Sequence, residues 1–71
     1  MTNKLSQREL QILRLVSLEH STVDIAEKLL ISSETVTTHG KNLMRKLDAS
    51  NTAGMIRRGF EVGFLIAGNR I

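Results

Sequence analysis

Serines that stand just before apolar, helix-spaced segments constrain this chain to a set of short helices. Ser6 is followed three residues later by Glu9, and Ser21 by Asp24, which is the spacing of a capping box at a helix start. Ser32 holds the same place before a third segment. Because no proline occurs in the chain, none interrupts the helices that these caps begin. We therefore expect helices that start at these serines and are joined by short turns.

The spacing of apolar residues sets the expected helix bounds. It predicts one helix over about 7–18 and a second that ends near Leu30. A third helix is predicted from 33 to about 47, after a tight turn, and a fourth is capped by Asn51 and stopped by Gly63. No segment alternates apolar with polar residues over a useful length, so no sheet or wing is expected. The predicted fold class is all-α, a four-helix helix-turn-helix domain.

Length and composition exclude several classes of function. With 71 residues the chain makes a single domain, predicted over 1–71 with its core over 5–65. The absence of cysteine excludes disulfides and thiolate metal sites. The sequence holds no paired carboxylates, Ser/His/Asp set, glycine-rich phosphate loop or metal-ligand cluster. We therefore expect no enzyme activity, no metal, no cofactor and no small-molecule ligand in this domain.

Membrane and export signals are also missing from the sequence. The longest apolar run, 64–67, is too short to cross a bilayer. The first ten residues lack the apolar stretch of a signal peptide. The expected location is the cytoplasm, with no membrane partner.

The positive charge of the chain lies in its C-terminal part. Residues 1–31 hold four basic and four acidic side chains, whereas residues 32–71 hold six basic and three acidic ones. The whole net charge of +3 therefore falls on the second segment, which favours an anionic partner there. A few extra basic residues also keep small domains soluble, so charge alone leaves both interpretations open.

The third predicted helix separates its side chains into an apolar and a polar face. At about 100° per residue, Val36, Gly40 and Leu43 share the buried side with Leu47. The opposite side is entirely polar and holds Glu34, Thr38, Lys41 and Arg45. A short helix, a tight turn and a longer basic helix make the layout of a helix-turn-helix, which lays its second helix in the major groove of DNA. The sequence therefore predicts double-stranded DNA as the partner.

The polar residues of this helix suit contacts with base edges and phosphates. Lys41 donates to guanine acceptors, and the methyl groups of Thr37 and Thr38 fit thymine methyls, so these three are the predicted base contacts. The predicted contacts to the DNA backbone lie along the helix and at the start of the second helix: Thr35, His39, Asn42, Arg45, Lys46, Ser21 and Thr22. Each has a simpler alternative, because polar helix faces are usually just solvated and a serine at a helix start also caps it.

Several sets of residues together resemble a known family. They are Leu5-Ser6-x-Arg8-Glu9 with Leu13, then Ser21-x-x-x-Ile25-Ala26-x-x-Leu29, then Ile31-Ser32-x-x-Thr35-Val36-x-x-His39-x-x-Asn42-Leu43-x-x-Lys46-Leu47, and last Glu61 with Gly63-Phe64-Leu65. Over 5–65 the chain is similar to the LuxR/FixJ-type, GerE-like helix-turn-helix domain of bacterial transcription regulators. The resemblance implies a domain that binds duplex DNA as a homodimer, with the third helix in the major groove and the fourth helices packed together.

The resemblance also implies roles at single positions and shows where the chain departs. Family members often have a basic residue where this chain has Thr37, an aliphatic residue where it has Gly40, and a turn glycine where it has Glu19. Gly40 lowers helix stability by about 1 kcal/mol relative to alanine and leaves its apolar neighbours less covered. Glu19 predicts a strained turn. Base contacts in the family fall at Thr37, Thr38 and Lys41, as predicted above.

The expected dimer surface is the side of the fourth helix that faces away from Ile56 and Phe60, which are predicted to point inward. That surface comprises four residues: Met55, Arg58, Gly59 and Val62. Gly59 and Gly63 would permit close approach of two helices. The alternative is that the apolar members of this set border the core of one protomer.

Two other functions stay open from the sequence. A sigma-factor region-4-like DNA-binding domain shares the capped helix pair and the Ser-x-x-Thr-Val start, and binding to core RNA polymerase would distinguish it. A helical protein–protein module that modulates a related regulator is favoured only by the departures at Thr37 and Gly40. RNA polymerase also stays open as a further partner of a DNA-binding regulator. The operator, the controlling signal and the direction of regulation do not follow from the residues.

Overall fold

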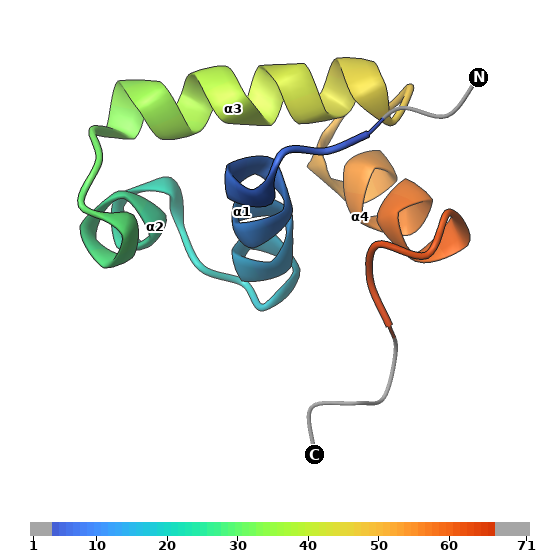
Figure 1. Ribbon diagram of the computed structural model, residues 1–71, viewed down its shortest axis with the longest axis horizontal. Coiled ribbons are helices and arrows are strands. Elements are labelled where there is room, and N and C mark those ends of the chain that lie inside the picture. Colours follow the sequence, from blue (N-terminus) through green and yellow to red (C-terminus); the bar gives the residue numbers. More distant parts are fainter. Residues whose placement is uncertain (1–3, 67–71) are drawn as a thin grey trace.

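The computed structural model describes residues 4–66, which form four helices and no strand. The helices are α1 (Gln7–Ser17), α2 (Thr22–Leu29), α3 (Ser33–Lys46) and α4 (Thr52–Glu61). α3 runs along one side of the molecule, and α1, α2 and α4 pack beneath it (Figure 1). The predicted all-α fold class is confirmed, and the helices end within about two residues of the predicted positions.

Each helix begins at the residue that the sequence predicted as its cap. The side-chain oxygens of the four caps accept backbone N–H groups in the first turn of their helices: Glu9 N to Ser6, Asp24 N to Ser21, Thr35 N to Ser32 and Gly54 N to Asn51. The carboxylates of Glu9 and Asp24 accept the backbone N–H of Ser6 and Ser21 in return. Both predicted capping boxes are therefore confirmed.

The chain leaves three of its helices through residues that carry a side chain and yet have a positive φ. Glu19, Leu30 and Asp48 have φ values of 70°, 58° and 56°. The left-handed conformation costs most non-glycine residues roughly 1–2 kcal/mol, so the strain predicted at Glu19 is present and recurs at Leu30, whereas aspartate tolerates this conformation better. After α4 the same task falls to Gly63, with φ 91°, as the predicted glycine stop requires.

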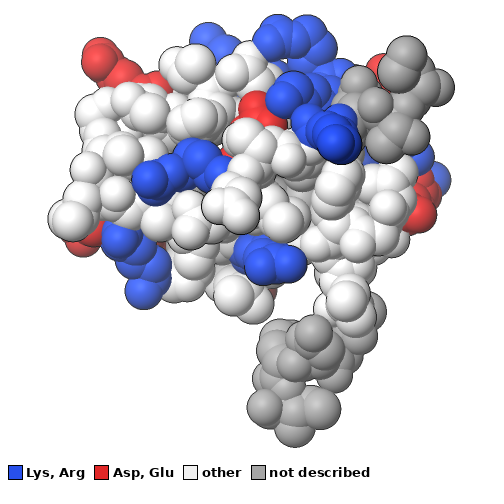
Figure 2. Space-filling model, in the orientation of Figure 1, with Lys and Arg blue, Asp and Glu red and all other residues white. Residues whose placement is uncertain are grey.

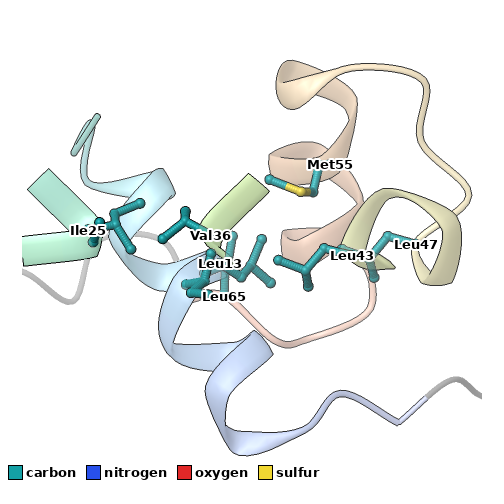
Figure 3. Close-up of a cluster of buried hydrophobic side chains, with 9 residues drawn as sticks. Leu13, Ile25, Val36, Leu43, Leu47, Met55 and Leu65 are labelled. Atoms are coloured by element: carbon teal, nitrogen blue, oxygen red, sulfur yellow. The ribbon is translucent and has the colours of Figure 1, made fainter. Parts of the chain in front are cut away.

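The core forms where α1 meets the other three helices. Leu13 of α1 and Leu43 of α3 are fully buried, and Ile25 of α2 is 1% exposed. Figure 3 shows Leu13, Val36 and Leu43 converging with Leu65 from the segment after α4. The predicted buried row of α3 is confirmed, since Val36 and Leu43 share this core with Leu47. One apolar cluster thus fixes the position of α3 relative to all three other helices.

The faces predicted for α4 are wrong at Phe60, Met55 and Gly59, whereas Ile56 packs against the core as predicted. Met55 is 2% exposed and Gly59 is buried, whereas Phe60, expected to point inward, is 42% exposed. The reason is the segment after Gly63, which folds back so that the Leu65 N–H donates to the Gly59 carbonyl at 3.0 Å. Its side chain then lies against Gly59. Met55 and Gly59 therefore belong to the core of one protomer and have little surface to offer to a second copy.

Alanine in place of Gly40 is expected to raise the free energy of unfolding by about 1 kcal/mol, because alanine favours the helix. A Cβ at position 40 would meet no atom within 4 Å, so packing does not oppose the gain. In a domain of this size the melting temperature should rise by about 4–8 °C. Urea denaturation of Gly40→Ala and the parent measures the difference.

Gly59→Ala is the matched control for this prediction. Its Cβ would lie 2.8 Å from Leu65 Cδ1 and 3.3 Å from Leu13 Cδ2, so the same gain in helix propensity is opposed by displacement of core side chains. We expect Gly59→Ala to be less stable than Gly40→Ala. Equal gains in the two variants would contradict the packing described for α4.

Candidate nucleic-acid interface

The outward face of α3 carries the residues that were predicted to read DNA. Thr37, Thr38 and Lys41 are all exposed, and so is Arg45 one turn further along the helix. Val36, which directly precedes the two threonines, lies on the inner face and is only 4% exposed. Figure 2 shows Lys and Arg side chains gathered over the C-terminal half of α3. The helix therefore separates an apolar inner face from a hydroxyl-bearing and cationic outer face, as the sequence predicted.

The start of α2 lies beside one flank of α3. Ser21 and Thr22 line the same surface hollow as Thr37 and Lys41 of α3. Ser21 already accepts the Asp24 N–H at 3.1 Å, so its hydroxyl serves first as a helix cap. Thr22 is exposed at the first helical position. The structure thus brings two predicted backbone contacts next to two predicted base contacts.

Some predicted backbone contacts on α3 are engaged within the helix itself. The Thr35 hydroxyl lies 2.8 Å from the Ser32 hydroxyl at the helix start. The Asn42 side-chain oxygen accepts a hydrogen bond from the Arg45 guanidinium. This bond holds the Arg45 side chain along α3, where Arg45 itself stays exposed.

His39 is half-buried, and its Nδ1 is enclosed without a hydrogen-bond partner. Buried polar atoms in proteins are usually paired by hydrogen bonds, so the unpaired Nδ1 of His39 is an exception. Because Nδ1 is shut in, a hydrogen bond from His39 to an outside group falls to Nε2. The phosphate contact of His39 stays a prediction that uses this one nitrogen.

Lys46 forms an ion pair that the sequence reasoning missed. Its Nζ lies 2.8 Å from Oε1 of Glu9 and donates to the Lys4 carbonyl at 3.3 Å. Glu9 is 5% exposed, the one charged residue in the described core. Its place on the α1 face that also carries Leu13 was the available signal, since an acidic group on a buried face requires a partner. The predicted phosphate contact of Lys46 stays a prediction, for an ammonium that already links α3 to α1.

Opposing effects set the acidity of Glu9. Burial acts to raise the pKa of its carboxyl, but the hydrogen bonds from Lys46 and from the Ser6 backbone, together with the charge of Lys46, outweigh it. The net result is a pKa below the ordinary glutamate value. The charged form of Glu9 is therefore the one that the fold stabilises.

Within residues 4–66 there is no group of three or more His, Asp or Glu side chains placed to hold a metal ion. None of the helices described here is both long and apolar enough to cross a membrane.

Comparisons with known proteins agree with this geometry. Residues 3–58 match the family described as bacterial regulatory proteins of the luxR family, GerE. The chain is 42% identical over 64 residues to the transcriptional regulatory protein MctR of Rhizobium johnstonii. It is 39% identical over 64 residues to the HTH-type transcriptional activator RamA of Corynebacterium glutamicum. Each match covers 90% of this chain but only 30% and 23% of the relatives, so the chain spans less than a third of their length.

Solved structures show the same likeness. The transcription factor GerE superposes with a TM-score of 0.83 at 35% identity, over 87% of this chain and 92% of GerE. The response regulator ChrA of a heme-sensing two-component system superposes with a TM-score of 0.85 at 31% identity, over 92% of this chain and 32% of ChrA. The four-helix arrangement described above is therefore shared with both proteins.

Replacing Glu9 with glutamine is expected to lower the free energy of unfolding at pH 7 by about 1–2 kcal/mol, because the ammonium of Lys46 loses its charged partner. The variant should also be less sensitive to acid. A carboxyl whose pKa is lower in the folded state stabilises the fold above its unfolded pKa, and that contribution is lost as the pH falls from about 5 to about 3. Urea denaturation across this pH range measures both effects.

Glu61→Gln serves as the control. Hydrogen bonds from Arg58 and Arg57 lower the pKa of Glu61, but this carboxyl lies at the surface, where salt screens its interactions. We expect the effect of Glu61→Gln on the pH dependence of stability to fade in 1 M salt, because charges are then screened over about 3 Å. The effect of Glu9→Gln should persist. If both fade equally, the Glu9–Lys46 pair is a surface interaction and not a link within the core.

Proposed function

The chain belongs to the luxR family of bacterial regulatory proteins, as a DNA-binding transcription regulator domain, and on that premise we propose how it reads its DNA. α3 lies in the major groove of duplex DNA, and its outer face contacts base edges. Residues 1–71 act in this proposal as a single DNA-binding domain. Its activity is binding, located in the cytoplasm, where the DNA and RNA polymerase that a regulator acts on are found.

One observation carries this proposal: α3 has opposite faces of opposite character. Its apolar side is held in the core through Leu43, so the helix cannot turn, and its hydroxyl and cationic side is exposed from Thr37 to Arg45. A helix fixed in this way presents the same groups to every partner. A rigid array of donors is what discrimination between base pairs requires, since each bidentate contact is worth about 1–3 kcal/mol.

The proposed contacts divide into base readers and backbone anchors. Lys41 donates to guanine O6 or N7, and the methyl groups of Thr37 and Thr38 meet thymine methyls. The backbone anchors are Ser21, Thr22, Thr35, His39, Asn42, Arg45 and Lys46. Among them Arg45 is an exposed cation on the outer face of α3, so it is the strongest candidate for a phosphate contact.

We also propose a homodimer through α4, with a surface revised from the one expected from the sequence. The outward row of α4 holds Ala53, Arg57 and Phe60 at helical spacing, and all three are exposed. Val62, 46% exposed at the end of the helix, is retained from the earlier set. Arg58 is already engaged within the protomer, since its Nε donates to the Leu47 carbonyl at 3.1 Å and its Nη1 donates to Glu61 at 2.9 Å. Two such rows give a symmetric contact centred on the apolar side chain of Phe60.

Lys41→Ala is expected to weaken binding to the preferred DNA site by about 1–3 kcal/mol and to relax the choice of base at the contacted position.

Arg45→Ala should instead weaken binding to all sequences and reduce the slope of log affinity against log salt by about 1. Selection from a random duplex library followed by fluorescence anisotropy at two salt concentrations measures both. An unchanged base preference in Lys41→Ala excludes its reading role. No binding by the folded protein favours a protein–protein module.

Phe60→Asp is expected to abolish the dimer while leaving the fold intact, because Phe60 is exposed in the protomer and an unpaired carboxylate opposes an apolar contact. Sedimentation equilibrium measures the dimer, and circular dichroism checks the fold. Glu27→Asp, on the exposed side of α2, is a control that should leave the dimer unchanged. A monomeric parent protein, or an unaffected Phe60→Asp dimer, rejects the α4 interface.

A further inference from the structure

A hollow of about 380 Å³ opens beside Gly40, between α3 and the other three helices. Gly40 lines it, and a Cβ at this position would meet no atom within 4 Å. A larger side chain at position 40 therefore has room to enter the hollow. The hollow lies within the usual size range of small-molecule sites, at the lower end.

The lining of the hollow is apolar in depth and polar at its edge. Its apolar part includes Val16, Val36 and Met44, together with the nearly buried Met55. Its polar part includes hydroxyl groups and the ammonium of Lys41, which is exposed. None of the described residues that line it is acidic. An occupant that matches this lining has an apolar group and a negative charge.

We propose that the hollow binds a small amphipathic carboxylate. Its alkyl or aryl group fills the space that Gly40 leaves against Val36 and Met44, where burial of apolar surface favours it. Its carboxylate lies at the edge beside Lys41, with which it forms a charge-assisted hydrogen bond. The sequence alone led us to expect no small-molecule ligand, because the hollow exists only where residues of all four helices come together.

The ligand regulates DNA binding, and this step rests on the proposed function. Thr37, Lys41 and Thr22 line the hollow and are also proposed DNA contacts. A carboxylate paired with Lys41 occupies the cation that would donate to guanine, so ligand and DNA compete for the same group. By linkage, each weakens the binding of the other by the same factor.

Octanoate is a suitable probe for the hollow, used below the concentration at which it forms micelles. In a ¹⁵N–¹H titration of the protein without DNA, we expect amide shifts at Gly40, Met44 and Thr52, which line the hollow, and little change at the outer side of α2. Octyltrimethylammonium has the same chain with the opposite charge and should bind at least tenfold more weakly. Shifts spread over the surface, or equal binding of the two probes, overturn the proposal.

Gly40→Leu tests the space directly. Leucine has room at this position and favours the helix, so the variant should fold with a melting temperature at or above that of the parent. It should bind octanoate at least tenfold more weakly, because its side chain fills the hollow. Gly54→Ala, a helical glycine that does not line the hollow, should bind octanoate as the parent does. Unchanged octanoate binding by folded Gly40→Leu rejects the site.

A second experiment separates this site from the proposed function. Octanoate should raise the apparent Kd of the parent protein for a labelled duplex, and it should have no such effect on Gly40→Leu. If octanoate binds in the hollow and DNA affinity does not change, the regulatory step is wrong. If the protein binds no DNA at all, the proposed function fails, and the titration without DNA still decides whether the hollow takes a carboxylate.

Discussion

The rest of the structure depends on the burial of Leu13 of α1 and Leu43 of α3 in one apolar cluster. Both side chains are fully enclosed, and they lie at the point where the helices converge. Because one face of α3 is buried in the core, the opposite face is exposed to solvent. The exposed threonines and the cations of α3 follow from this constraint and not from any property of their own. An apolar cluster in a small core thus determines where the polar groups of the domain stand.

The Glu9–Lys46 pair adds direction to this apolar cluster. Apolar side chains tolerate a small rotation or slide of one helix on another, whereas a buried carboxylate with a 2.8 Å ammonium partner accepts only a narrow range of positions. Glu9 Oε1 also accepts the Ser6 N–H, so one oxygen joins the start of α1 to the end of α3. The ion pair therefore fixes how far along α1 the third helix lies.

The features that the sequence predicted correctly are those that short stretches of chain determine. Ser6, Ser21, Ser32 and Asn51 act on backbone groups three residues away, so their roles are legible without knowledge of the fold. The faces of α4 depend instead on Leu65, which returns from beyond the helix and covers Gly59. The ion pair joins residues 37 positions apart, and the hollow beside Gly40 is bounded by all four helices. Such features exist only after the helices have packed.

The positive φ values at Glu19, Leu30 and Asp48 have a consequence for how such a domain changes over time. Each of these turns holds a residue less suited to its conformation than glycine or asparagine. Substitution by glycine or asparagine at any of the three would therefore raise the free energy of unfolding. None of the three belongs to the proposed DNA contacts or to the proposed dimer surface. Substitutions there adjust the tolerance of the protein to heat and to further mutation, while the recognised sequence stays the same. Robustness and specificity are thereby free to evolve on separate residues.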